Sequence, residues 1–380
     1  MAVYKLNEIA PIQQGTLSEN DKYWLLNLDM VESNSGKVLG YNYVSSDQIG
    51  ASTIAFDTNN VLYSKLRPYL NKVVLPTQNG YATSEMVPLR PNTNIITREY
   101  LTYLLRSPLF VTYINSKTSG AKMPRAKLDA LKNYEIDCPP IVDQVARTTR
   151  LDEIVTAAEI CREQIEKYDL LIKARFVEMF GDPVSNEKGW VTRPLLSMGS
   201  CKNGMNFHYD DSGVEINCLG VGDFKDYSII DDTATLPTVS LNEMPSSEYL
   251  LRDDDIVFVR SNGNKKMVGR SVAVYPGTVP TTFSGFCIRY RREDDSVITP
   301  YLLRVLKAES MRQKMYGRGA NIQNLNQQTL SSLDIPVPPS VMQEQFAIFV
   351  AQVDKSKAVV QSIMDKLNTL QVSLMQEYFG

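Results

Sequence analysis

Two stretches of the chain carry apolar residues that recur every seven positions. In the first they are Leu151, Ala158, Ile165, Ile172 and Met179, with Ile154, Cys161, Tyr168 and Arg175 as a second register. In the other they are Val353, Val360, Leu367 and Leu374, with Phe349, Ser356, Ile363 and Leu370. Such a repeat is typical of the a and d positions of a coiled coil. We therefore expect one long helix over 141–182 and another over 340–380, each entered from a rigid Pro-Pro pair.

These two helices have two ways to bury their apolar stripes. They can pair with each other as an antiparallel coiled coil, provided that the intervening segment returns the chain, which would place a globular domain at either end of a rod. Alternatively, each can pair with a helix of another chain, and the simplest interpretation is then a dimerisation zipper with no further function.

The rest of the chain alternates short apolar runs with turn residues. VLYSKL (61–66), DIVFVR (255–260), SVAVY (271–275) and FCIRYR (286–291) are typical of strands. Helical periodicity is confined to residues 98–116 and to a similar stretch around 300–315. We expect a mixed α/β (α+β) fold in this part of the protein.

An internal repeat relates the two halves of the chain. SGAKMPRAKLDALKNYEIDCPP (119–140) aligns with RGANIQNLNQQTLSSLDIPVPP (318–339), and a long helical stretch ending in Phe-Gly follows each segment. The sequence thus predicts a first globular domain at 1–140, a first long helix at 141–182, a second globular domain at 183–339 and a second long helix at 340–380.

Composition narrows the functional class. The chain has 380 residues with a formal net charge of −3, so positive charge for a nucleic-acid partner has to be local. No apolar run is long enough to cross a membrane, and the start shows no signal peptide. Five widely spaced cysteines and a single histidine, His208, argue against a zinc site, a disulfide framework or a histidine-based mechanism, and a reducing cytoplasm fits best.

Catalytic motifs are missing from the sequence. Gly36-Lys37 is followed by Val38, so no phosphate-cradling loop is formed. The Pro-Pro pairs lack the preceding Asn or Asp that an amino-methyltransferase uses to hold a flipped base. The acidic runs Asp253–Asp255 and Glu293–Asp295 are interpreted as solvated turns. We expect no catalytic residue and no metal site.

Basic, amide-rich clusters occur in both halves and suit the recognition of DNA. Arg and Lys pair with guanine or phosphate, and Asn and Gln pair with adenine. The candidate DNA-binding residues of the first half are Lys65, Arg67, Tyr69, Asn71, Lys72, Lys122 and Arg125. Those of the second half are Arg260, Asn262, Asn264, Lys265, Lys266, Arg270, Arg318, Asn321 and Gln323, with Asn324 beside them. Two readers at a fixed separation are what a split DNA site requires.

The chain resembles the specificity (S) subunits of Type I restriction–modification enzymes over essentially its whole length. The resemblance rests on LRPYLNK (66–72), GYATSEMVPLRP (80–91), the Gly-Ala phrase that ends at Pro140, the helix ending FVEMFGDP (176–183), and the repetition of this layout. The helix starts PPIVDQVARTT (139–149) and PPSVMQEQFAI (338–348) depart from the usual family pattern, of which Gln144, with Gln343 and Gln345, remains.

This resemblance implies two target-recognition domains and an antiparallel coiled coil with pseudo-twofold symmetry. It implies a noncatalytic subunit that reads a bipartite site in double-stranded DNA and binds two methyltransferase subunits. Those subunits, and not this chain, would hold S-adenosylmethionine, and restriction subunits can join them. A variant within the family serves a methyltransferase that has no associated nuclease. The alternative from another class is a coiled-coil protein-binding scaffold with no DNA readout.

Overall fold

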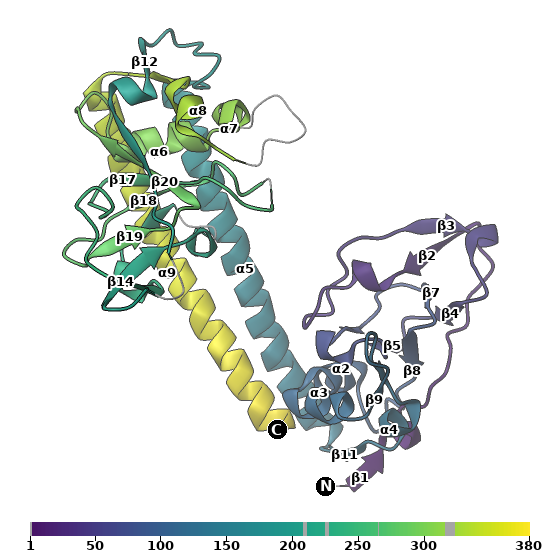
Figure 1. Cartoon of the computed structure of the whole chain (residues 1–380). Coiled ribbons are helices and arrows are strands. Elements are labelled where there is room, and N and C mark those ends of the chain that lie inside the picture. The colour runs from purple at the N-terminus through teal and green to yellow at the C-terminus, as the bar shows by residue number, and fades with distance from the viewer. Residues whose placement is uncertain (1, 208–210, 225–227, 265, 316–323) are drawn as a thin grey trace. The chain divides into compact units, whose positions relative to one another are not determined.

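The computed structural model describes residues 2–207, 211–224, 228–264, 266–315 and 324–380 (Figure 1). The chain forms two compact units. Unit 1 contains residues 1–163 and 361–380, and unit 2 contains residues 164–360. Each unit thus combines one globular part with the halves of two long helices, α5 (Ile141–Phe180) and α9 (Ser340–Phe379). The division into four segments made from the sequence stays a prediction.

The globular part of unit 1 is built from short strands and helices. A sheet of order β3-β2-β7-β4 contains one parallel pair, β2 with β7, and a second sheet has the order β6-β5-β8. The strands are β1 (Ala2–Lys5), β2 (Lys22–Leu26), β3 (Tyr43–Ser45), β4 (Thr53–Phe56), β5 (Val61–Ser64), β6 (Val73–Val74), β7 (Gly80–Thr83), β8 (Met86–Leu89), β9 (Thr118–Ser119), β10 (Arg125–Ala126) and β11 (Glu135–Cys138). The helices are α1 (Leu6–Ile9), α2 (Arg98–Arg106), α3 (Pro108–Asn115) and α4 (Leu128–Lys132), with single 3₁₀ turns at Leu28–Met30, Ser46–Gln48 and Pro68–Leu70.

Unit 2 repeats part of this topology. Its sheets have the orders β13-β20-β17-β18-β15 and β16-β14-β19, and β14 pairs in parallel with β19 as β2 does with β7. The strands are β12 (Thr192–Pro194), β13 (Gly199–Asn203), β14 (Val214–Leu219), β15 (Ile229–Ile230), β16 (Thr238–Leu241), β17 (Asp255–Val259), β18 (Ser271–Val274), β19 (Thr281–Phe283), β20 (Cys287–Arg292) and β21 (Asp334–Pro336). The helices are α6 (Thr299–Lys307), α7 (Glu309–Met315) and α8 (Gln327–Ser331), with 3₁₀ turns at Leu195–Ser197, Val221–Asp223 and Thr233–Thr235.

The helical stretch at 98–116 is interrupted in the structure, so the single periodicity of the sequence covers two helices. The Ser107 side chain accepts a hydrogen bond from the Phe110 amide, and Pro108 occupies the first turn of α3. A Ser followed by Pro is a strong start signal for a helix, because proline's missing N–H is not needed there. The equivalent break in unit 2 lies at Ala308, between α6 and α7.

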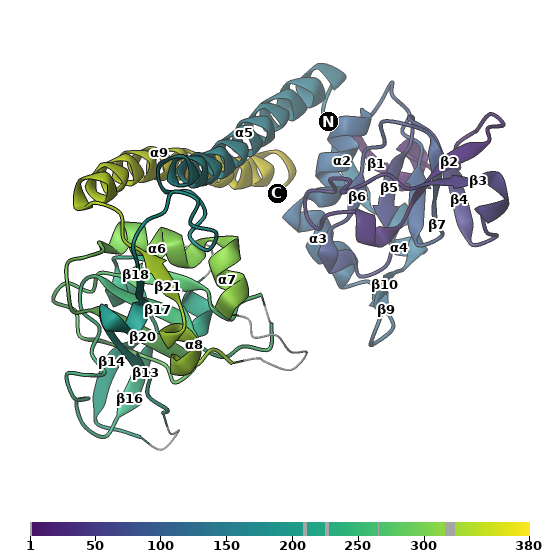
Figure 2. The ribbon, with the colours of Figure 1, turned by 90° about the horizontal axis from the view of Figure 1, so that it is seen from above.

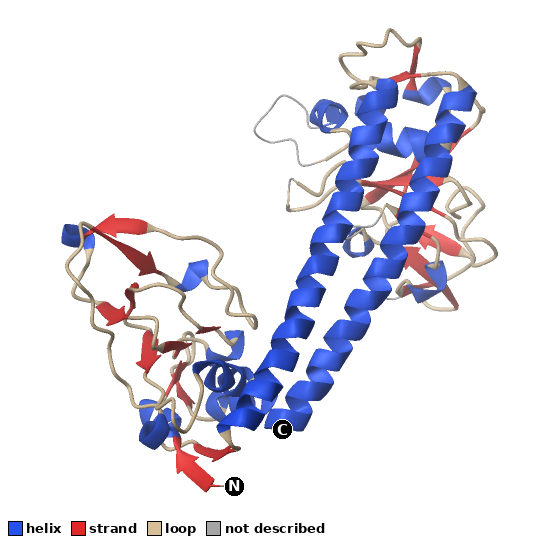
Figure 3. Ribbon diagram, turned by 180° about the vertical axis from the view of Figure 1, so that it is seen from behind, coloured by secondary structure: helices blue, strands red, loops and turns tan. Residues whose placement is uncertain are grey.

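The two long helices run antiparallel within each unit. In unit 1 the Arg147 Nη1 donates to the Tyr378 carbonyl, near the start of α5 and the end of α9. In unit 2 the Lys357 Nζ pairs with Asp169, and the Phe176 ring contacts the Phe346 ring. Figure 3 shows α5 and α9 side by side. The antiparallel pairing of the two long helices within the chain is therefore confirmed.

The prediction for one of the heptad registers of α9 was wrong. Both registers of α5 are buried or half-buried, and so is the register of α9 that begins at Val353. The second register of α9, however, is set by Val350, Lys357, Met364, Gln371 and Tyr378, one position after the prediction. The apolar Ile363 and Leu370 of the predicted register are each 46% exposed.

The core of unit 2 joins the long helices to the sheet. Ile172, Phe346 and Val353 of α5 and α9 pack in one cluster with Tyr301 of α6 and Phe258 of β17. Figure 2 shows α6 between the long helices and the strands. The corresponding cluster in unit 1 includes Leu151 of α5, Met375 and Phe379 of α9, and Leu101 of α2.

Candidate nucleic-acid interface

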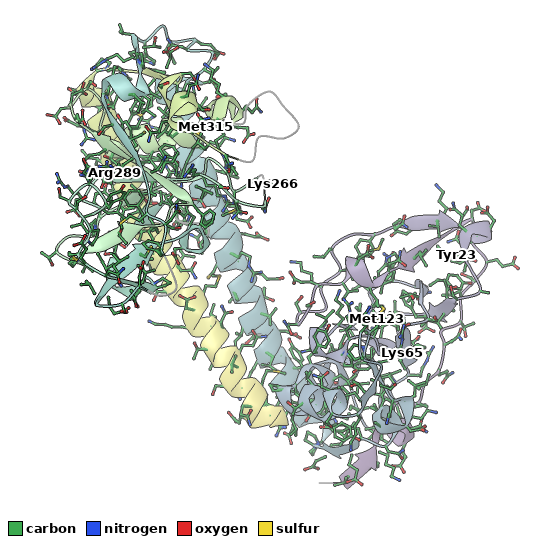
Figure 4. All side chains as sticks on the ribbon, in the orientation of Figure 1. Tyr23, Lys65, Met123, Lys266, Arg289 and Met315 are labelled. Atoms are coloured by element: carbon green, nitrogen blue, oxygen red, sulfur yellow. The ribbon has the colours of Figure 1, made fainter. Side chains whose placement is uncertain are left out.

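Two loops that the sequence singled out separately meet in unit 1. The first hairpin loop (residues 65–72) follows β5, and the first Gly-Ala loop (residues 119–126) precedes α4. The Arg67 amide donates to the Pro124 carbonyl at 2.7 Å, and the Ala126 amide donates to the Lys65 carbonyl at 2.8 Å. We name this contact the first loop junction. Figure 4 labels one residue on each side of it, Lys65 and Met123.

The outer side chains of the first loop junction face solvent. Arg67 is exposed and has a backbone φ of 49°, in the left-handed region that non-glycine residues rarely occupy. Tyr69 is 52% exposed, and Lys122 is exposed as well. Local backbone strain of this kind concentrates at functional sites.

Asn71 and Lys72 turn towards the domain instead. The Asn71 Nδ2 donates to the Arg106 carbonyl at 3.0 Å, and the Lys72 Nζ donates to the Leu28 carbonyl at 2.6 Å. These bonds fix the hairpin loop to the body of unit 1. A direct DNA contact by Asn71 or Lys72 stays a prediction. Such a contact would break the side chain's hydrogen bond to the body of unit 1.

Arg125 forms a two-pronged ion pair across the junction. Its Nε donates to both carboxylate oxygens of Glu85, at 3.0 and 3.2 Å, and its Nη2 donates to Glu85 Oε1 at 2.8 Å. The hydrogen bonds and charge of Glu85 raise the pKa of Arg125 further. Glu85 precedes β8 and was not among the predicted residues, although it lies within the phrase GYATSEMVPLRP.

Unit 2 contains an equivalent second loop junction. The Leu325 amide donates to the Arg260 carbonyl at 2.8 Å, as Ala126 does to Lys65 in unit 1. A β-bridge joins Ser261 to Asn324, as another joins Leu66 to Arg125. The backbone thus brings the second hairpin loop (residues 260–270) against the segment that begins at Asn324.

Several predicted residues of the second hairpin loop make local contacts. Arg260 Nη1 donates to the Gly285 carbonyl at 3.2 Å. Asn262 and Asn264 accept hydrogen bonds from the amides of Asn264 and Lys266, which shape the turn. Lys266 is exposed (labelled in Figure 4), and Arg270 is half-buried. Lys265, Arg318, Asn321, Gln323 and His208 lie outside the described residues.

The comparisons with known proteins agree with this duplicated layout. The family model for the Type I restriction modification DNA specificity domain matches residues 1–167 and 222–369. The chain belongs to this family. The family resemblance drawn from the sequence is confirmed, and so is the fold of two similar α/β domains with long helices.

Individual relatives of this specificity-domain chain are distant. The Type I restriction enzyme StySPI specificity subunit of Salmonella potsdam is 23% identical over 314 residues, which cover 77% of this chain and 66% of the relative. The chain therefore spans slightly less than two thirds of that relative's length.

Two solved structures share the fold over the whole chain. One, from work on complex assembly and conformational transition of the type I R-M system, has a TM-score of 0.62 at 16% identity and is covered over 97% of its length. The other is the type I restriction-modification S subunit from M. genitalium, with a TM-score of 0.59 at 15% identity and 96% of its length covered. The family and its curated members are named for DNA specificity and for specificity subunits.

The long helices of this specificity-domain protein expose apolar side chains outside their seam. Leu170, Leu171 and Val177 of α5 are 63%, 46% and 49% exposed. Exposed residues also recur as pairs at equivalent positions of the repeat, namely Val142 with Val341, Ile160 with Val359, and Leu171 with Leu370. The recurrence of exposed apolar side chains at equivalent positions of the two long helices makes this helix surface a candidate interaction site. Within the described ranges, none of the helices combines the length and apolar character that crossing a membrane requires.

Proposed function

We propose that the chain reads a bipartite site in double-stranded DNA, one half-site for each globular part, and directs methyltransferase subunits to that site. The observation that carries this proposal is the duplicated loop junction. An equivalent backbone hydrogen bond and an equivalent β-bridge occur in both units, and each junction carries exposed polar side chains, Arg67 in unit 1 and Asn324 in unit 2 among them. Phosphate contacts position such a reader, and base contacts give it specificity.

Two methyltransferase subunits are the partners that this proposal requires. The exposed pairs of apolar residues on α5 and α9 support it, because each pair offers one similar patch for each of two copies of a partner. We further propose that S-adenosylmethionine is held by these partners and that this chain binds no cofactor. In a full restriction system, restriction subunits join the complex in the cytoplasm, where the host DNA lies.

The family to which the chain belongs does not favour a scaffold without DNA readout. Gel retardation of the copurified complex on duplex DNA tests the proposal. The complex of this chain with its cognate methyltransferase should retard duplex DNA. A stable complex that leaves duplex DNA unretarded would support the protein scaffold. The double variant Ile160→Ser with Val359→Ser should lose the methyltransferase during purification without losing its fold, because both side chains are more than half exposed.

A further inference from the structure

We propose that one pair of side chains at each loop junction reads a base pair: Arg125, held by Glu85, reads guanine in one half-site, and Asn324 with Phe286 reads an adenine–thymine pair in the other. This inference rests on the proposed function and assigns the reading positions within it.

The backbone makes these positions equivalent. The Lys65 amide donates to the Glu85 carbonyl at 3.0 Å, and the Arg260 amide donates to the Phe286 carbonyl at 2.8 Å. Glu85 therefore corresponds to Phe286. The β-bridges Leu66–Arg125 and Ser261–Asn324 make Arg125 correspond to Asn324 in the same way. One scaffold thus carries a charged pair in unit 1 and an aromatic–amide pair in unit 2.

The ion pair is not needed to hold the loops of unit 1 together. In unit 2 one of these backbone bonds and the β-bridge recur among the described residues, although the charged pair is replaced by Phe286 and Asn324. If these side chains served to hold the loops together, unit 2 would need another stabilising contact between the same two positions. A residue that contacts a base can instead differ between the units, because each unit reads its own DNA sequence. The chemical difference at equivalent positions favours the second role.

The geometry of the ion pair prepares Arg125 for guanine. Glu85 binds the side edge of the guanidinium, which consists of Nε and Nη2. The end edge, formed by Nη1 and the second N–H of Nη2, is then directed away from the carboxylate. Its Nη1 makes one long hydrogen bond, to the Met123 carbonyl at 3.5 Å, which guanine would have to replace. The Arg125 side chain is 45% exposed, whereas that of Glu85 is 22% exposed. A planar guanidinium fork matches the O6 and N7 acceptors of guanine, and a fork held in place by a carboxylate loses less entropy on binding.

The second pair has the chemistry of an adenine–thymine reader. Asn324 is exposed, and its amide can donate to N7 and accept from N6 of adenine. Phe286 is 62% exposed at the start of β20, where an apolar ring can contact the thymine methyl group. A contact with the thymine methyl group would bury part of this exposed ring, which is favourable.

Methylation mapping with the intact complex tests this assignment. Arg125→Ala should lower discrimination for guanine at one position of one half-site by about 5- to 150-fold and leave the other half-site unchanged. Arg125→Lys keeps a charge for Glu85 but loses the fork, so it should lose the same discrimination while its thermal midpoint stays at the wild-type value. Lys127→Ala, two positions away and also exposed, is the matched control for lost positive charge.

The double variant Glu85→Phe with Arg125→Asn should move the preference at that position from guanine to adenine. An unchanged motif in all Arg125 variants, or an equal loss on every sequence, would overturn the assignment and leave the proposed function intact. If the wild-type complex methylates without any sequence preference, the proposed function itself fails.

Discussion

Gln144 and Gln343 occupy equivalent positions at the starts of the two long helices, and both are fully buried. The Gln144 Oε1 accepts from the Thr97 amide at 2.9 Å, and its Nε2 donates to the carbonyls of Ile95 and Pro139. The same three bonds recur around Gln343. Each glutamine thereby ties a long helix to the N-cap residue of a helix in its globular part, Thr97 of α2 or Ile298 of α6.

Replacing Gln144 with Ala should destabilise unit 1. The substitution leaves the Thr97 amide and two carbonyls without partners in a buried place, which costs about 1–3 kcal/mol for each group left unsatisfied. Denaturant unfolding followed by circular dichroism measures the loss. Gln345→Ala is the control, because Gln345 is exposed and should change the free energy of unfolding by less than about 0.5 kcal/mol. Equal losses in both variants would contradict the role of Gln144.

Two valines on α9 test the corrected seam. Val353 is 7% exposed and belongs to the core of unit 2, whereas Val359 is 57% exposed. Val353→Ala removes two buried methyl groups and should cost about 1.6 kcal/mol, at about 0.8 kcal/mol for each. Val359→Ala should leave stability nearly unchanged in the isolated chain and should weaken copurification with the methyltransferase. The account of the helix surface fails if Val359→Ala is the more destabilising variant.

Two substitutions of Arg67 distinguish the effect of backbone strain from the effect of charge. Both Arg67→Ala and Arg67→Gly remove the guanidinium and should weaken recognition of the first half-site to the same extent. Arg67→Gly should also raise the free energy of unfolding by about 1 kcal/mol, because glycine adopts a φ of 49° without the steric cost. Thermal unfolding and binding titrations on DNA with one altered half-site measure the two effects. If Arg67→Ala loses recognition and Arg67→Gly keeps it, the loss comes from the backbone conformation and not from the missing charge.

The heptad pattern predicted both long helices, because apolar periodicity is local information. It misplaced one register of α9 because Ile363 and Leu370 are apolar but exposed. The register that faces α5 includes Lys357. This residue pairs with Asp169, which lies 188 positions earlier in the chain. Two apolar stripes thus lie on one helix, and the sequence alone does not say which of them faces the partner helix.

The candidate DNA-binding site shows the same limit of prediction from the sequence. Sequence composition found the basic loops, and Arg125 among them, but Glu85 became meaningful only when folding placed it against Arg125 from 40 positions away. Asp255 was interpreted as part of a solvated turn, which was wrong: it is 1% exposed and binds Arg291 with both carboxylate oxygens. A buried ion pair between strands leaves no local signal in the sequence.

We expect Lys307 to make the stability of unit 2 depend on pH. Burial, and then the charge of Arg304, lower the pKa of Lys307 to about 7 from 10.5. Between these values the unfolded chain holds the proton and the folded chain does not, so the free energy of unfolding rises with pH over this range. Lys307→Met should flatten this rise in urea unfolding measured at several pH values. Lys355→Met, at an exposed site on α9, should keep it. A rise that survives in Lys307→Met would have to come from another group.

The most direct test of the central claim is a map of methylated adenines. The chain is expressed with its cognate methyltransferase in a host without other adenine methylation, and the host DNA is sequenced by a single-molecule method. The account predicts one bipartite motif, with two specific parts separated by a fixed run of unspecified bases. Omitting the chain should abolish the methylation, and Arg67→Ala should alter only one part of the motif. A contiguous motif, or the same methylation by the methyltransferase alone, would contradict the account.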